Sequence, residues 1–216
     1  MPPRLPDRNA ALAQYRRRAR LYDFELALFE PIRRRAIAEL DVYRGDVVLD
    51  VGCGTGLSLA LLRERVGTRG RVIGIEQSPE MLSRARRRVA EARWRNVELI
   101  ESPVEEAELD DPADAALFHF THDILRRPDA VANVMHHLRP GAHVVATGLK
   151  WARPLLAPAN LVVLPAALHS VTSLEGLAQP WSHLQRHLAG LEVRQRLLGG
   201  VFIASGRRDP HLELNA

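Results

Sequence analysis

The chain has 216 residues, of which 46% are hydrophobic and 26% are charged, as in an ordinary folded globular domain. This composition excludes intrinsic disorder, collagen-like repetition and a multi-pass membrane protein. The single cysteine excludes a disulfide framework and a cysteine-rich zinc site, and it favours a reducing compartment. The first ten residues hold three prolines and no apolar core, so we expect no signal peptide and a cytoplasmic protein.

Basic residues outnumber acidic ones by four, and the whole excess lies in residues 1–44. All but one of the 30 basic residues are arginine, which indicates a composition bias rather than a binding function. The densest clusters lie within residues 16–20 and 33–35. We interpret them first as solvated helix faces and second as a contact for an anionic surface or ligand. Because nucleic-acid binders usually have a broader basic surface, we do not expect nucleic acid as a partner.

Apolar residues at three- and four-residue spacing predict helix over residues 10–40, broken once at Pro31. From Gly45 onward, short apolar runs alternate with helical segments. We predict strands at 46–51, 71–76, 97–101, 115–120 and 143–147. Helices are predicted at 57–65, 79–93 and 129–138, with Ser78 as the cap of the second and Pro140-Gly141 as the end of the third. Continuous apolar strands separated by helices predict a parallel sheet that is covered on both faces.

The C-terminal third of the chain departs from this alternation. No residue from 154 to 174 carries a formal charge, but Pro158, Asn160 and Pro165 interrupt the segment, so we do not expect a membrane span. The segment suits a cap over the core, a roof over a substrate pocket or a dimer contact. Residues 191–198 and 201–205 then predict two strands joined by Gly199-Gly200, a hairpin that adds an antiparallel strand to the sheet.

The most informative motif is Asp50-x-Gly52-x-Gly54-x-Gly56, which follows a predicted strand and precedes a predicted helix. Glycines let a ligand approach the backbone, and a helix N-terminus presents unpaired N–H groups. Glu76 stands at the end of the next strand, where an acid can accept both hydroxyl groups of a ribose. Dinucleotide-binding folds instead use the spacing G-x-G-x-x-G. An acid before the loop repels a pyrophosphate and suits a ligand that carries an ammonium or sulfonium cation.

This pattern resembles the class I S-adenosylmethionine-dependent methyltransferases, and most closely the ubiquinone/menaquinone-biosynthesis and phospholipid methyltransferase group. The resemblance runs from about Tyr22 to Arg207 and includes residues 78–82, the turn at 138–141 and the closing hairpin. It implies an α/β fold with a Rossmann-like, doubly wound sheet of seven strands, mostly parallel, with an antiparallel C-terminal hairpin strand and helices on both faces. It also implies an enzyme with the cofactor S-adenosyl-L-methionine and the product S-adenosyl-L-homocysteine.

The resemblance assigns the methionine part of the cofactor to the glycine loop and the ribose to Glu76. Many relatives have Gly-Asp-Ala after the third strand, and the aspartate bonds the adenine amino group. Here Pro103 takes that position, so adenine recognition passes to the Val104 backbone N–H, with Ser102 or Glu105 as helpers. The implied cofactor-binding residues are Asp50, Gly52, Cys53, Gly54, Gly56, Glu76, Gln77, Met81, Pro103, Val104, Glu105, His119 and Tyr22, the last of which would close over the cofactor.

Methyl transfer from a sulfonium is an in-line displacement that needs aligned atoms and no covalent nucleophile. Cys53 therefore needs no chemical role, and we expect it to fill the loop as a small residue. An acidic acceptor group must lose a proton, so His119 and His122 are candidate catalytic residues, with His122 the preferred base. Shaping the pocket through hydrogen bonds is the alternative role for both. His119, His122 and Asp123 make no convincing ligand set, and we expect no metal.

The sequence thus predicts one methyltransferase domain over residues 1–216. Its parts are a helical cap (1–44), a cofactor-binding core (45–150), an apolar cap (151–190) and a closing hairpin (191–207). The expected acceptor is small or lipid-like: a lipid head group, a quinone precursor or an aromatic metabolite. RNA methylation and cofactor binding without catalysis are the alternatives. A homodimer and a peripheral membrane contact through the arginine-rich N-terminal helix are further expectations.

Overall fold

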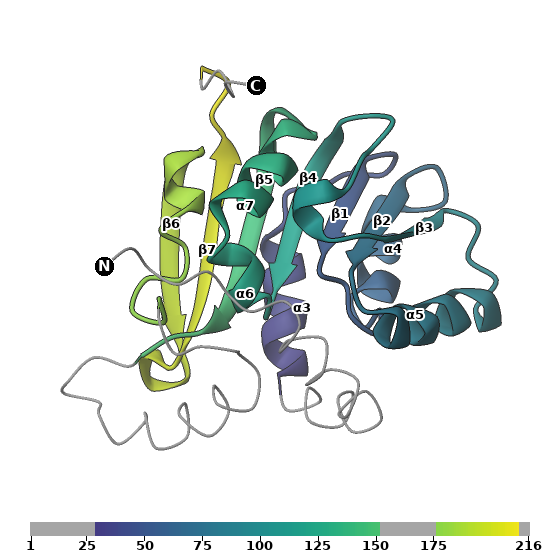
Figure 1. Cartoon of the computed structure of the whole chain (residues 1–216), viewed down its shortest axis with the longest axis horizontal. Coiled ribbons are helices and arrows are strands. Elements are labelled where there is room, and N and C mark those ends of the chain that lie inside the picture. The colour runs from purple at the N-terminus through teal and green to yellow at the C-terminus, as the bar shows by residue number, and fades with distance from the viewer. Residues whose placement is uncertain (1–28, 152–175, 212–216) are drawn as a thin grey trace.

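The computed structural model describes residues 29–151 and 176–211, which form a seven-stranded sheet of order β3-β2-β1-β4-β5-β7-β6 (Figure 1). The parallel strands are β1 (Val47–Val51), β2 (Arg71–Glu76), β3 (Val97–Glu101), β4 (Ala113–His119) and β5 (Leu138–Leu149). The strand β7 (Val201–Arg208) lies antiparallel between β5 and β6 (Leu188–Arg196). The predicted fold class, a mostly parallel sheet closed by an antiparallel hairpin, is confirmed.

Helices cover both faces of the sheet because successive side chains of each buried strand point to opposite faces. In β1, Val48 packs with α3 (Glu30–Glu39), α4 (Leu59–Val66) and α5 (Pro79–Glu91). The next residue, Leu49, packs on the other face with α6 (His122–Leu125) and α7 (Pro128–His136), as Figure 1 shows. The 3-10 turns η1 (Val104–Glu106), η3 (Leu184–Arg186) and η4 (Leu197–Gly199) complete the described elements.

The order of the strands determines where on the sheet the candidate site lies. Chain order reverses at β1, which lies between β2 on one side and β4 on the other. In doubly wound sheets the loops that follow such neighbouring strands diverge, and ligands bind at that point. Here the glycine loop follows β1 and His119 ends β4, so both lie at this carboxyl edge.

The predicted break at Pro31 coincides with the start of α3 at Glu30, and Pro31 lies in the first turn of this helix, where its missing N–H is not needed. One predicted helix boundary is wrong. The helix predicted to reach residue 138 ends at His136, and β5 runs through Pro140-Gly141. The hydrogen-bond ladder between β4 and β5 is irregular over this stretch. A proline is tolerated at such a bulge because its position needs no backbone N–H for the ladder.

Two predicted segments, the helix over residues 10–28 and the charge-free stretch 154–174, lie outside the described residues. Within the part of the chain that the structure describes, no helix is long and apolar enough to cross a membrane.

The predicted cap of α5 yields a stability test. The buried Ser78 Oγ accepts the Met81 N–H at 3.4 Å and donates to Glu80 at 3.1 Å. We expect Ser78→Ala to lower the free energy of unfolding by about 1 kcal/mol. In a chain of this size, thermal unfolding should show a melting temperature lower by about 2–4 °C. Ser83→Ala, at an exposed position of the same helix, is the matched control. Equal effects of both changes would contradict a capping role.

Candidate functional site

The loop after β1 depends on glycine for its backbone shape. Gly52, Gly54 and Gly56 adopt φ values of 68°, 57° and 81°, a left-handed region that costs other residues about 1–2 kcal/mol. A Cβ on Gly56 would lie 3.3 Å from the Ala85 Cα, so this glycine lets α5 pack closely against the loop. It does not line the cavity described below, whereas the other two glycines do.

A buried carboxylate holds this loop in place. The two carboxylate oxygens of Glu76 accept the Gly54 N–H at 3.0 Å and the Ser78 N–H at 2.8 Å. Burial raises the pKa of Glu76, while these backbone hydrogen bonds oppose the rise. The side chain therefore connects the end of β2 to the glycine loop and to the start of α5. Of the two residues predicted beside it, Gln77 is partly buried and Met81 is buried in α5.

A cavity lies between the glycine loop, α3 and the end of β4. It brings together several of the predicted residues, namely Asp50, two loop glycines and His119. Cys53 also lines it, and its Sγ packs against Gly74 of β2, where a Cβ would lie only 2.9 Å away. The full lining comprises Arg33, Asp50, Gly52, Cys53, Gly54, Thr55, Leu57, Ser58 and His119.

Asp50 is the acid among the residues that line this cavity. The residue is 2% exposed, and its Oδ2 accepts no hydrogen bond from the described residues. Burial raises the pKa of Asp50 to about 7; Arg33 opposes this rise and the charge of Glu76 adds to it. A buried carboxylate oxygen without a partner is costly, so this geometry suits a ligand that brings a cationic donor.

Arg33 is a cavity residue that the sequence patterns did not identify. The prediction of a solvated face agrees with the next two arginines, whose side chains are 63% and 58% exposed. It is wrong for Arg33, whose side chain is 3% exposed and forms an ion pair with Glu30. Arg33 shares the buried face of α3 with Ala36 and Ile37. Positions 33, 36 and 37 are three and four residues apart, a spacing typical of one helix face. This pattern in the sequence could have identified Arg33 as buried.

The two candidate catalytic histidines lie in different places. His119 ends β4 and lines the cavity, and its shielded ring nitrogens form no hydrogen bond within the described residues. Burial, together with the charge of Arg33, lowers the pKa of His119 to about 3, so its ring is neutral near pH 7. His122 is buried at the start of α6 and lies outside the set that lines the cavity.

The segment predicted to meet adenine follows β3. Pro103 and Val104 are buried, and an asparagine side chain of α7 donates to the Val104 carbonyl oxygen at 2.7 Å. Both proposed helpers have partners within the chain. Glu105 pairs with Arg127 at 3.0 Å, and the Ser102 hydroxyl donates to the Pro103 carbonyl oxygen. Tyr22, predicted to close over the cofactor, lies outside the described residues.

An apolar cluster lies beside the end of β4 at the same edge of the sheet. Leu149, Leu177 and Val201 form its buried centre. The rings of Phe29 and Phe120 are 4.7 Å apart, and the Phe120 ring lies 4.9 Å from that of His119. The partly buried residues that pack on the centre are Phe29, Ile32, Phe120 and Trp151. The cluster therefore places aromatic surface next to the cavity.

Known proteins are similar to this chain in sequence. The family described as "Methyltransferase domain" matches residues 48–141. Aklanonic acid methyltransferase DauC of Streptomyces sp. (strain C5) is 31% identical over 163 residues, which cover 71% of this chain and 70% of that protein. A phosphatidylethanolamine N-methyltransferase of Cereibacter sphaeroides is 38% identical over 141 residues, which cover 63% of this chain and 66% of that protein.

A solved structure agrees at the level of the fold. N-methyltransferase NodS from Bradyrhizobium japonicum WM9, in complex with S-adenosyl-L-homocysteine, superposes with a TM-score of 0.60 at 17% identity. The superposition covers 83% of this chain and 87% of that chain. With the sequence match to DauC extending over most of both proteins, the chain belongs to the class I S-adenosylmethionine-dependent methyltransferases and is an enzyme that uses this cofactor.

Proposed function

We propose that this enzyme methylates a small or amphiphilic acceptor that has an apolar body and a polar reacting end. The observation that carries the proposal is the aromatic surface of Phe29, Phe120 and Trp151 beside the glycine-loop cavity. Such surface is suited to a ring or an alkyl chain and poorly suited to a phosphate backbone. A lipid head group, a quinone precursor and an aromatic metabolite are the proposed acceptor classes.

The residues of the cavity fit the cofactor. S-adenosylmethionine supplies an activated methyl group on a sulfonium, and its methionine part is a zwitterion. The open Oδ2 of Asp50 suits the ammonium group, and the Arg33 guanidinium in the same cavity suits the carboxylate. Glu76 would bind the ribose, because each carboxylate oxygen can accept a further hydrogen bond beyond its backbone partner.

The two histidines receive separate proposed roles. The low pKa of His119 makes it a weak proton acceptor, which supports the role of shaping the pocket. His122 remains the proposed base for an acceptor with an acidic proton. The names of the two curated relatives are consistent with the acceptor class, since one acts on aklanonic acid and the other on phosphatidylethanolamine.

Cofactor binding should depend on pH through Asp50. The pKa of about 7 means that the acid is mostly protonated below pH 7 and ionised above it. Because an ammonium group needs the ionised form, we expect S-adenosylhomocysteine to bind about tenfold more tightly at pH 7.5 than at pH 5.5. Calorimetry on Asp50→Asn should give weaker binding with little change over this range. An unaltered pH profile in that variant would show that another group titrates.

Arg33 should contribute to cofactor affinity, unlike its neighbour. We expect Arg33→Met to weaken S-adenosylhomocysteine binding by about 10–100-fold, because a charge-assisted hydrogen bond contributes about 1.5–3 kcal/mol. The loss of its charge should also move the pH dependence of binding upward, since Arg33 lowers the pKa of Asp50. The exposed Arg34→Met is the control. Equal affinities of the two variants, both folded by circular dichroism, would refute the assignment.

The acceptor class is tested with methyl-labelled S-adenosylmethionine. The acceptors are phosphatidylethanolamine, a hydroquinone with an isoprenoid chain, an aromatic hydroxy acid and total RNA. We expect label in at least one of the first three. Label in RNA alone would contradict the proposal and support the alternative of an RNA methyltransferase.

With the best acceptor of that panel, Phe120→Ala should raise the KM about tenfold, because an apolar pocket contact contributes about 1–3 kcal/mol. The affinity for S-adenosylhomocysteine should stay unchanged. The control is Tyr43→Ala, which removes an aromatic ring that is 69% exposed and lies before β1. A fall in cofactor affinity instead of a rise in KM would place Phe120 on the cofactor side of the site.

A further inference from the structure

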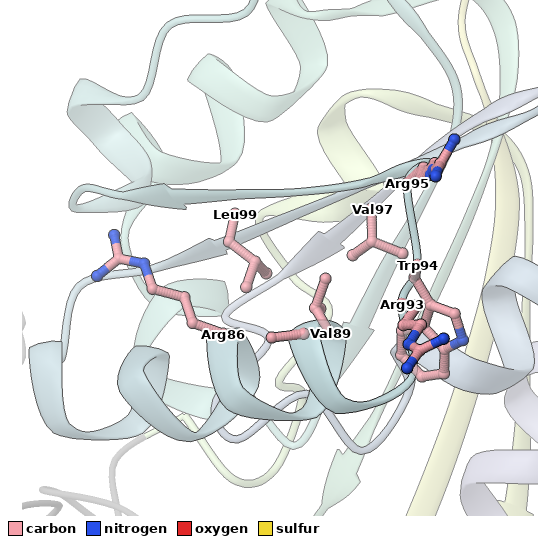
Figure 2. Close-up of a pocket in the computed structure, with 8 residues that line it drawn as sticks. Arg86, Val89, Arg93, Trp94, Arg95, Val97 and Leu99 are labelled. Carbon is pink, nitrogen blue, oxygen red and sulfur yellow. The ribbon is translucent and has the colours of Figure 1, made fainter.

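A second depression lies outside the cofactor cavity, between α5 and the edge strand β3. This groove has a volume of about 450 Å³. Figure 2 shows the side chains of Val97 and Leu99 extending from β3 toward the helix, and Val89 extending from the helix toward the strand. The full lining comprises Arg86, Val89, Ala90, Arg93, Trp94, Arg95, Val97 and Leu99, and none of these residues belongs to the glycine-loop cavity. The floor of the groove is therefore apolar.

The rim of the groove is strongly basic. Residues 83–96 contain six arginines and one acid. Arg86 pairs with Glu101 at 2.9 Å, but Arg93 and Arg95 form no ion pair with any described residue. Two guanidinium groups thus stand beside the apolar floor and are available to an anionic partner.

The strand beside the groove also offers backbone hydrogen bonds. The Asn96 carbonyl oxygen accepts the Val72 N–H at 3.0 Å, and the Ser102 N–H donates to the Glu76 carbonyl oxygen at 3.2 Å. Backbone groups of successive residues in a strand point to opposite sides, so the even-numbered residues face β2. Val97, Leu99 and Glu101 therefore direct their N–H and C=O groups away from the sheet. The first two are the residues whose side chains line the groove.

We propose that an extended acidic segment of a partner protein binds here and adds a strand to β3. Its backbone would pair with Val97 and Leu99, and its alternate apolar side chains would fill the groove. Its carboxylates would face Arg93 and Arg95. A second copy of this chain is a poor occupant, because a symmetric contact through β3 would bring two basic rims together.

The test is selection of short random peptides displayed on phage against the full chain saturated with S-adenosylhomocysteine. We expect the enriched peptides to alternate acidic and apolar residues. Hydrogen exchange should slow at the amides of Val97, Leu99 and Glu101 when such a peptide binds. A proline at the centre of the peptide should abolish binding, since it removes a backbone donor.

Variants test the basic rim. The double variant Arg93→Gln/Arg95→Gln should weaken the affinity for the selected peptide at least about tenfold, by fluorescence anisotropy. Arg87→Gln is the matched control, because Arg87 lies on α5 outside the groove lining. Enrichment of no peptide, or binding without protection of β3, would overturn the proposal. Displacement of the peptide by myristate, with myristate alone giving no protection of β3, would indicate a site for anionic amphiphiles instead and would also overturn it.

Discussion

The geometry of the glycine loop depends on one buried carboxylate. Glu76 accepts N–H bonds from Gly54 and Ser78, so a single side chain connects the ends of β1 and β2 with the start of α5. Burial disfavours the ionised form of a carboxyl group, and hydrogen bonds from backbone amides favour it. The Gly54 bond that holds the glycine loop and the Ser78 bond at the start of α5 therefore also favour the charged form of Glu76. Because the amides belong to separate loops, movement of the carboxylate would loosen both.

The other charges of the cavity are balanced only in part by the chain itself. Burial raises the pKa of Asp50 and lowers that of His119; the charge of Arg33 lowers both, and the charge of Glu76 raises that of Asp50. The result is an acid that titrates near neutral pH and a histidine that stays uncharged. A cation bound at Asp50 would favour the ionised form and satisfy its open oxygen, so binding would relieve the cost of burying that acid. Under the proposed cofactor assignment, this coupling would favour a ligand that carries a cation.

Local patterns predicted those features that depend on neighbouring residues in the chain. The ends of β2 and β3 match the prediction, because each apolar run there is bounded by polar or turn residues. Contacts between distant segments explain the failures. Pro140-Gly141 is typical of a helix end, but pairing of β5 with β4 places it in a bulged strand. The glycine motif assigns Gly56 to the ligand, and it does not reveal the close packing against Ala85 that also requires a glycine there. Arg33 lies among other arginines, and only the docking of α3 on the sheet places it in the cavity.

The two edges of the sheet differ in a way that bears on partners. The pairing of β6 with β7 is irregular between Ala189 and Glu192, and such bulges protect an edge from further pairing. Between Val97 and Glu101, β3 pairs with β2 without interruption and its outer backbone groups are in register. The same strand leads directly into Pro103 and Val104, the segment proposed to meet adenine. A strand added at β3 would cover the groove. It would also restrict the movement of the backbone that runs from β3 into Pro103 and Val104. Recognition of a partner and recognition of the adenine would then share one structural element.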